Sequence, residues 1–128
     1  MAIYKNKVFQ RFARKNDISD AALNAAARAV MAGNADADLG GGVYKQRVAR
    51  DGAGRSGGYR TLLLYKIGGH AYFAHGFAKS NKGNIDGRDL DALKAAAKVY
   101  ARLSTEQITA AVAADELIEV SDEGKEGE

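Results

Sequence analysis

Two apolar segments joined by a pair of glycines constrain the fold of this chain more than any other feature. Residues 59–67 (YRTLLLYKI) and 70–78 (HAYFAHGFA) are rich in aromatic and branched apolar side chains, as β-strands are. The Gly68-Gly69 pair between them is typical of a tight hairpin turn. The sequence therefore predicts two antiparallel strands in the middle of the chain.

A third strand is predicted at residues 43–49 (VYKQRVA), where charged and apolar residues alternate. The alternation places Lys45 and Arg47 on one face, and Arg60 opens the neighbouring strand. Three cations that reach one phosphodiester can neutralise it and stabilise a pentacovalent phosphorane. The alternative is an ordinary solvated sheet face, where Lys and Arg are common.

Helical patterns lie on both sides of these strands. Helices are expected around Val8 to Phe12, after a cap at Ser19, after Asp86, and after Ser104, whose partner Gln107 completes a capping box. Residues 34–42 are predicted to be a loop, and residues 117–120 can add an edge strand. This order predicts an α+β fold: a small twisted antiparallel sheet of 3–5 strands, with an N-terminal helical hairpin and C-terminal helices packed on one face and the other face free.

The charges divide the chain into a basic body and an acidic end. Residues 1–114 carry 18 Lys or Arg and nine Asp or Glu, whereas residues 115–128 carry one Lys and seven acids. A basic body indicates an anionic partner. We expect one domain over residues 1–120 and a flexible acidic tail at 121–128, which is either solvated or lies against the basic surface and competes with that partner.

Composition excludes several classes of site. The chain has no cysteine, so disulfides and thiolate metal sites are impossible, and two histidines five residues apart make a poor zinc site. The GxxxxGK[ST] spacing of a nucleotide-triphosphate loop is absent. We therefore expect no metal and no cofactor. With no long apolar run and no signal-peptide pattern, we expect a cytoplasmic protein without a membrane partner.

Further candidate residues surround the three cations. His75 can act as a general acid or base because imidazole titrates near neutral pH, although a histidine in an apolar strand is commonly a packed residue. The RNA-binding candidates are basic, amide or aromatic side chains in or beside the strands: Arg50, Arg55, Tyr59, Asn81 and Lys82. Tyr59 can stack on a base, or bury its ring in the core as strand tyrosines commonly do.

Three sequence blocks carry a family resemblance: VYKQRVA, GRSGGYRTLLLYK and YFAHGFAKSNKGNI, followed by a helix. They resemble the RelE/HigB group of bacterial type II toxins, and in particular a branch with the signature YK.RVA..G.GKSGGYR and GFAK.N..NI. The resemblance covers roughly residues 3–120. It implies two N-terminal helices on a small twisted sheet and a C-terminal helix. It also implies a cytoplasmic toxin held inactive by a cognate antitoxin, which cuts mRNA on the ribosome without a metal through attack of the ribose 2′-hydroxyl on the adjacent phosphate.

The resemblance also implies roles for particular residues. Lys45 and Arg47 match the paired basic residues of the first central strand, Arg60 matches the phosphate-contacting arginine, and Lys79 matches a lysine at the end of the last strand. Two positions depart from the family: Ser80 follows that lysine where an arginine is expected, and Asp86 stands where a functional tyrosine is expected. The missing roles would then fall to Lys82, Asn81, His75 or Arg55, and no spacing distinguishes these four.

Three functions remain open from the sequence. The first is a ribosome-dependent mRNA endonuclease. The second is a non-catalytic inhibitor or binding module, such as a ParE-like gyrase inhibitor or a regulator that binds nucleic acid. The third is a general RNA- or DNA-binding domain with no toxin role. Codon preference, the identity of the antitoxin and the oligomeric state are not encoded in any pattern of the chain.

Overall fold

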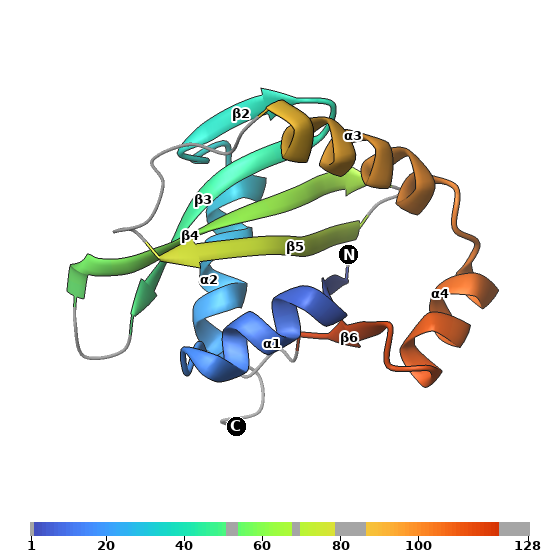
Figure 1. Ribbon diagram of the computed structural model, residues 1–128, viewed down its shortest axis with the longest axis horizontal. Helices are drawn as coiled ribbons and strands as arrows, with labels where there is room; N and C mark the ends of the chain where they lie inside the picture. The colour runs from blue at the N-terminus through green and yellow to red at the C-terminus, as the bar shows by residue number, and fades with distance from the viewer. Residues whose placement is uncertain (1, 51–53, 68–69, 79–86, 121–128) are drawn as a thin grey trace.

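The computed structural model describes residues 2–50, 54–67, 70–78 and 87–120, and the acidic tail therefore lies outside the described residues (Figure 1). The chain is α+β, as predicted. The elements follow in the order β1 (Ile3–Asn6), α1 (Lys7–Lys15), α2 (Asp20–Met31), β2 (Ala37–Gly40), β3 (Val43–Arg50), β4 (Gly54–Ile67), β5 (His70–Ala78), α3 (Gly87–Ala101), α4 (Thr105–Ala113) and β6 (Leu117–Glu119).

The strands form one six-stranded sheet in the order β2-β3-β4-β5-β1-β6. The predicted antiparallel set of β3, β4 and β5 is confirmed, but the sheet is larger than expected and mixed, because β1 pairs parallel with β5. Parallel pairing is possible here because residues 7–69, which contain two helices and three strands, connect β1 to β5. Segment 117–120 does supply an edge strand, since β6 pairs antiparallel with β1.

The predicted loop at residues 34–42 is wrong in part, because it contains β2. This short strand pairs with the start of β3, with Ala37 opposite Lys45. The three glycines that follow, Gly40 to Gly42, have φ values of +87°, +63° and +85° and make the tight turn into β3. The glycine run is therefore a hairpin turn that adds an edge strand to the sheet.

Helices α1 and α2 cover one face of the sheet. Ser19 caps α2 as predicted, accepting a hydrogen bond from the Ala22 N–H at 3.1 Å. Both helices pack on strand residues in one hydrophobic core, the α1–α2 cluster: Ile3, Phe9, Ala13, Ile18, Leu23, Ala26, Ala27, Val30, Val48, Tyr59, Leu63, Tyr65, Ala71, Phe73 and Val120.

The second face of the sheet is not free, which corrects the expectation from the sequence. Helix α3 lies across one end of it, and α4 follows after the predicted capping box of Ser104 and Gln107 (Figure 1). The buried residues here form the α3 cluster: Tyr4, Val43, Leu64, Tyr72, Ala74, Ala97, Ile108 and Leu117. The strands β3, β4 and β5 extend beyond this cluster, so α3 covers only part of the face. No helix among the described residues is long and apolar enough to cross a membrane.

Candidate functional site

The basic side chains of β3 and β4 meet on the face that carries α3. Val43 pairs with Leu64, Lys45 with Leu62, and Arg47 with Arg60. Paired residues in a sheet point to the same face, and alternate residues of a strand share that face. Val43 and Leu64 lie beneath α3. Lys45 and Arg47 follow Val43 along β3, and Arg60 follows on β4 beyond Leu64, so all three lie on the same face but past the helix. We call these three residues the basic patch.

The basic patch is open to solvent. Arg47 is exposed, and Lys45 and Arg60 are partly exposed, whereas the intervening Leu62 is fully buried. Arg47 and Arg60 lie directly opposite each other on neighbouring strands, about 4.8 Å apart in the pairing direction. Like charges in directly opposed positions repel each other and destabilise a sheet. An anion bound between them relieves this repulsion, so the arrangement favours a phosphate ligand.

Strand β5 adds His75 and Phe77 to the same face through a β-bulge. Leu63 pairs with Phe73 but Leu62 pairs with His75, which leaves Ala74 as an extra residue. Phe73 belongs to the α1–α2 cluster and Ala74 to the α3 cluster, as strict alternation requires. Alternation alone would then turn His75 to the α1–α2 side. The bulge reverses this order, so His75 lies in the row of Lys45, and Phe77 lies in the row of Arg47 and Arg60.

The Asn6 side chain ties this bulge to the start of α1. Its Oδ1 accepts a hydrogen bond from the Phe9 N–H at 2.8 Å, which caps the helix. Its Nδ2 donates to the carbonyl of Ala74, the extra residue of the bulge, at 3.2 Å. One amide therefore joins the start of α1 to the extra residue of the bulge.

Gly76 confirms the direction of its neighbours. A Cβ atom built at Gly76 would lie 2.4 Å from Cε2 of Phe12, a residue of α1. Gly76 therefore faces the helices α1 and α2, in the same row as the buried Thr61. His75 and Phe77, on either side of it, point to the opposite face, where the basic patch lies.

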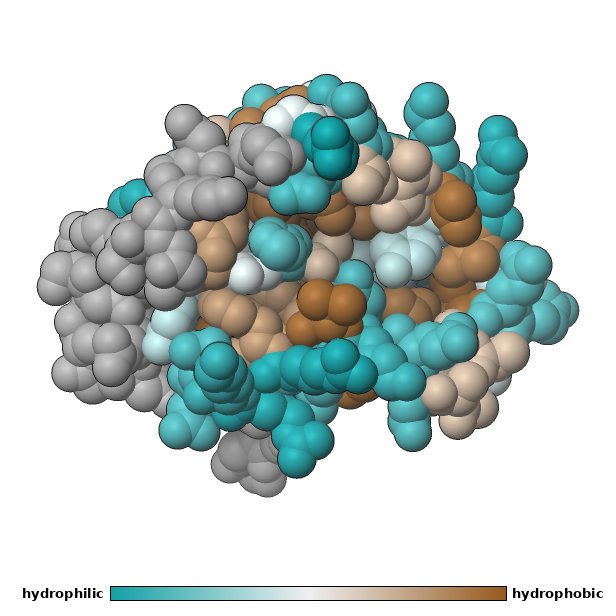
Figure 2. All heavy atoms as spheres, viewed as in Figure 1, coloured by the Kyte–Doolittle hydropathy of each residue, from teal (hydrophilic) through white to brown (hydrophobic). Residues whose placement is uncertain are grey.

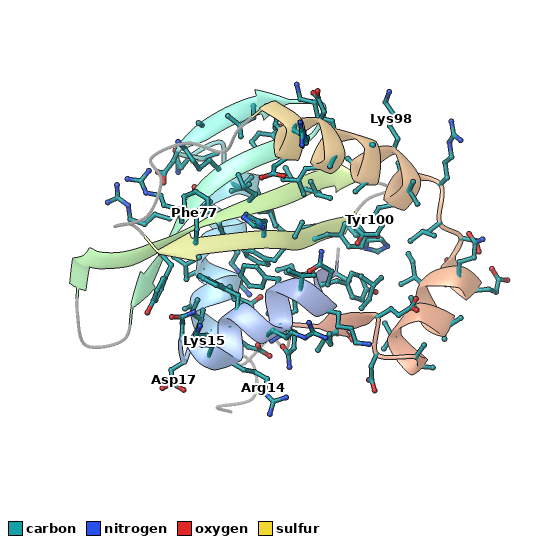
Figure 3. All side chains as sticks on the ribbon, viewed as in Figure 1. Arg14, Lys15, Asp17, Phe77, Lys98 and Tyr100 are labelled. Atoms are coloured by element: carbon teal, nitrogen blue, oxygen red, sulfur yellow. The ribbon has the colours of Figure 1, made fainter. Side chains whose placement is uncertain are left out.

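The surface of the face that carries α3 agrees with the strand pairing of β3, β4 and β5. Figure 2 shows apolar surface over β4 and β5, between α3 and α1, with hydrophilic side chains around it. Figure 3 places Phe77 toward the end of β5, whereas Lys98 and Tyr100 lie at the far end of α3. The open part of the sheet thus combines an apolar floor with basic side chains.

Tyr59 does not belong to this surface, and its expected RNA contact is corrected. It alternates with Arg60, so it points to the α1–α2 side. Tyr59 is 9 % exposed, and its ring packs edge to face on that of Phe12, with centroids 5.6 Å apart. The sequence left two roles open for Tyr59, stacking on a base and packing in the core, and the structure shows packing in the core.

The remaining candidates stay predictions. Arg50 and Arg55 lie in β3 and β4, but their side chains are outside the described part of the chain. The segment 79–86 is also outside it, and this segment contains Lys79, Ser80, Asn81, Lys82 and Asp86. Phe77 lies on the face of the basic patch as well, although it is not among the site residues predicted from the sequence. The face of the sheet to which Phe77 points is set by the bulge, and no residue pattern in β5 predicts that bulge.

A stack of tyrosines holds α3 at its end of the face. Tyr72 lies between Tyr4 and Tyr100, with ring centroids 5.6 Å and 4.6 Å away. Burial, with the neighbouring Tyr4 and Tyr100, raises the pKa of Tyr72 to about 12. Burial also raises the pKa of Tyr4 and Tyr100. These phenols stay protonated at neutral pH, so they serve as packing and anchor the helix away from the basic patch.

A second hollow lies at the end of α1, with a volume of about 860 Å³. Its lining mixes charges: Lys5, Arg14 and Lys15 lie there with Asp17, and Lys5 is paired with Asp20 at 3.1 Å. Figure 3 shows Arg14, Lys15 and Asp17 together at this end of α1, remote from Phe77. The neighbouring carboxylates offset part of the positive charge, so this hollow is a weaker phosphate site than the basic patch. Among the described residues, no group of three or more His, Asp or Glu side chains could hold a metal ion.

Comparison with known proteins agrees with the arrangement of the sheet and helices. Residues 1–120 match the model of a family described as the RelE toxin of the RelE/RelB toxin–antitoxin system. This match covers both hydrophobic clusters and every strand of the sheet. A search of curated proteins finds no match.

Proposed function

Because the chain belongs to the RelE family of toxins from type II toxin–antitoxin systems, we propose that it is a ribosome-dependent mRNA endonuclease whose active site is the basic patch. RelE toxins are generally endoribonucleases, and the RelE/RelB pairing implies a cognate antitoxin as protein partner. The observation that carries the proposal is the direct opposition of Arg47 and Arg60 on an open sheet face. An anion between them removes a repulsion that the folded chain otherwise retains.

The reaction we propose is attack of a ribose 2′-hydroxyl on the adjacent phosphorus. A base removes the hydroxyl proton, the new P–O bond forms, and the bond to the 5′-oxygen of the next nucleotide breaks as an acid protonates that oxygen. The products are a 2′,3′-cyclic phosphate and a free 5′-hydroxyl. Arg47 and Arg60 hold the non-bridging oxygens, whose negative charge increases in the phosphorane.

We assign the two proton transfers to Lys45 and His75. They lie in one row, on either side of Leu62, so their backbones are separated by two strand spacings, or about 9.6 Å. The attacking and leaving oxygens of an in-line displacement lie on opposite sides of the phosphorus. A phosphate above Leu62 therefore has one proton-transfer group on each side. General acid–base catalysis of this kind typically contributes 10²- to 10⁴-fold in rate.

Substitution of the patch in cells tests the proposal. Induction of the wild-type chain without its antitoxin should arrest translation and leave cut mRNA with 2′,3′-cyclic phosphate ends. Arg60→Ala combined with Lys45→Ala should abolish both effects, and Arg60→Ala alone should slow cutting roughly 10²- to 10³-fold, as loss of one charge-stabilising group does. His75→Gln, which cannot exchange a proton at neutral pH, separates acid–base catalysis from phosphate binding.

The matched control removes two positive charges elsewhere. Lys98 on α3 and Arg102, which directly follows that helix, are both exposed. Lys98 lies at the far end of α3 from Phe77 (Figure 3). Lys98→Ala with Arg102→Ala should leave cutting unchanged. Full arrest by the Lys45/Arg60 double variant, at equal protein level, would refute the assignment of the active site.

A non-catalytic inhibitor is the second candidate, favoured by Ser80 and Asp86 at positions where the resemblance implies arginine and tyrosine. Mapping of RNA ends during induction separates the two candidates. Intact mRNA together with DNA damage would support a gyrase inhibitor and overturn the nuclease proposal. Lys79 belongs to the proposed site only through the resemblance, and Lys79→Ala tests it in the same assay.

A further inference from the structure

Phe77 is an aromatic side chain without a place in either hydrophobic core. Neither the α1–α2 cluster nor the α3 cluster includes it, although both extend to partly buried side chains at their edges. Its ring is partly exposed, and its described ring contact is His75, with centroids 6.0 Å apart and planes inclined at 42°. Among the residues that the structure describes, a partly exposed phenyl ring thus lies beside basic side chains and outside both clusters.

The neighbours of Phe77 are those that bind phosphate in the proposed site. Phe77 pairs directly with Arg60, and Arg60 pairs with Arg47, so the three residues form one row across β5, β4 and β3. Adjacent members of such a row are about 4.8 Å apart. Aromatic rings next to basic side chains on an open sheet are the arrangement by which sheets bind unpaired RNA bases.

We propose that Phe77 is a stacking platform for an unpaired RNA base of the nucleotide whose phosphate is bound by Arg60 and Arg47. The inference rests on the proposed function, which it deepens by naming the substrate as single-stranded RNA with one base turned out of its stack. A base within a duplex cannot lie on Phe77, because both of its faces are covered by neighbouring bases. Purines are favoured over pyrimidines, since their larger rings overlap the phenyl ring more fully.

The bulge of β5 is what makes this platform possible. Without the extra residue Ala74, Phe77 would face α1 and α2, in the direction that Gly76 now takes. The face of Phe77 is thus set by the same irregularity that brings His75 into the row of Lys45. One structural device therefore supplies both a proton-transfer group and a base contact to the basic patch.

A binding experiment with modified RNA tests the stacking directly. The probe is a short single-stranded oligonucleotide with 2′-methoxy groups, which blocks attack of the 2′-oxygen, and with the fluorescent base 2-aminopurine at successive positions. Stacking on the phenyl ring should quench 2-aminopurine at one position on addition of the wild-type chain. Phe77→Leu should abolish this quenching and weaken binding roughly 5- to 150-fold, the range for loss of one base–aromatic stack. Phe77→Tyr and Phe77→Trp should restore both.

An abasic oligonucleotide provides the matched control. Removal of the base at the quenched position should weaken binding of the wild-type chain by the same factor, and Phe77→Leu should then have no further effect. Equal losses from Phe77→Leu on the intact and abasic RNA would overturn the proposal, because they would show an effect of Phe77 on the fold or on phosphate binding alone. If Phe77→Leu does not fold, the comparison of intact and abasic RNA on the wild-type chain decides the matter.

The outcomes also separate this inference from the proposed function. Tight binding without quenching at any position would overturn the platform and leave the phosphate site in place. Quenching that depends on Phe77, in a chain that leaves cellular mRNA intact, would support the platform and refute the nuclease. Absence of any binding to single-stranded RNA would overturn the platform.

Discussion

Replacement of Gly76 by alanine probes the contact that sets the direction of β5. The added Cβ would lie 2.4 Å from Cε2, 2.5 Å from Cδ2 and 3.0 Å from Cζ of Phe12. Ordinary van der Waals contact begins at 3.4 Å, so the Phe12 ring must retreat by about 1 Å or the strand must shift. The Phe12 ring is partly exposed, but it packs on Phe9 and Tyr59 with centroids 5.7 Å and 5.6 Å away, so a movement away from Gly76 disturbs these contacts.

The expected cost follows from these contacts. Overpacking of a well-filled core typically costs about 1–3 kcal/mol, and loss of one aromatic pair adds about 0.5–1.5 kcal/mol. Replacing glycine also restricts the unfolded chain, which offsets about 0.4–1 kcal/mol. We expect Gly76→Ala to lower the free energy of unfolding by about 2 kcal/mol.

Urea unfolding measures this cost as a lower midpoint with an unchanged m-value. Gly87→Ala is the matched control, because a Cβ at Gly87 meets no atom of the described residues within 4 Å. That variant should be neutral or slightly stabilising, since alanine is the better helix former. Phe12→Leu should reduce the cost of Gly76→Ala in a double-mutant cycle. A Gly76→Ala chain as stable as wild type, with Phe12 intact, would refute the orientation assigned to β5 and with it the direction of Phe77.

Three further predictions concern individual polar groups. Asn6→Asp keeps a good helix cap but removes the amide donor to Ala74, so it should lower the free energy of unfolding by about 1–3 kcal/mol, measured by urea unfolding. Ser104→Ala removes half of the capping box of α4 and should cost about 1 kcal/mol in the same assay, whereas Ser104→Asp should retain most of the stability. Among the described residues the Tyr72 hydroxyl is buried without a hydrogen-bond partner, so Tyr72→Phe should be neutral or stabilising. The raised pKa of Tyr72 means that the unfolded phenol loses its proton near pH 10 and the folded one near pH 12. Stability should therefore be complete below pH 10 and fall as the pH rises toward 12, and Tyr72→Phe should reduce this fall in urea midpoints measured against pH.

The elements with strong local signals could be read from the sequence. The capping residues Ser19 and Ser104 predicted the starts of α2 and α4, because a capping side chain accepts a hydrogen bond from a backbone N–H only three residues further along the chain. Alternation along β3 placed Lys45 and Arg47 together, because strand side chains change faces at every residue. These features depend on neighbours along the chain, so no knowledge of the fold was needed.

The extent of the sheet depended on contacts between distant segments. The strand β1 joins β5 in parallel, β2 adds an edge next to β3, and α3 covers part of the face that the sequence left free. Short strands of four residues carry little periodicity of their own, and they become strands only when a partner satisfies their backbone groups.

The chain by itself determined a basic, helix-flanked sheet, because charge, capping and alternation act over a few residues. Only the tertiary structure decided which side chains of β5 join the basic patch. The extra residue Ala74 turns both His75 and Phe77 to the face of the basic patch, and it is held by Asn6, which is 68 residues away in the sequence. A bulge of this kind is favoured by packing on both faces of the sheet, with Phe12 against Gly76 on one side and Ala74 within the α3 cluster on the other. Because the position of the bulge depends on packing between segments distant in the sequence, no single stretch of the sequence predicts it.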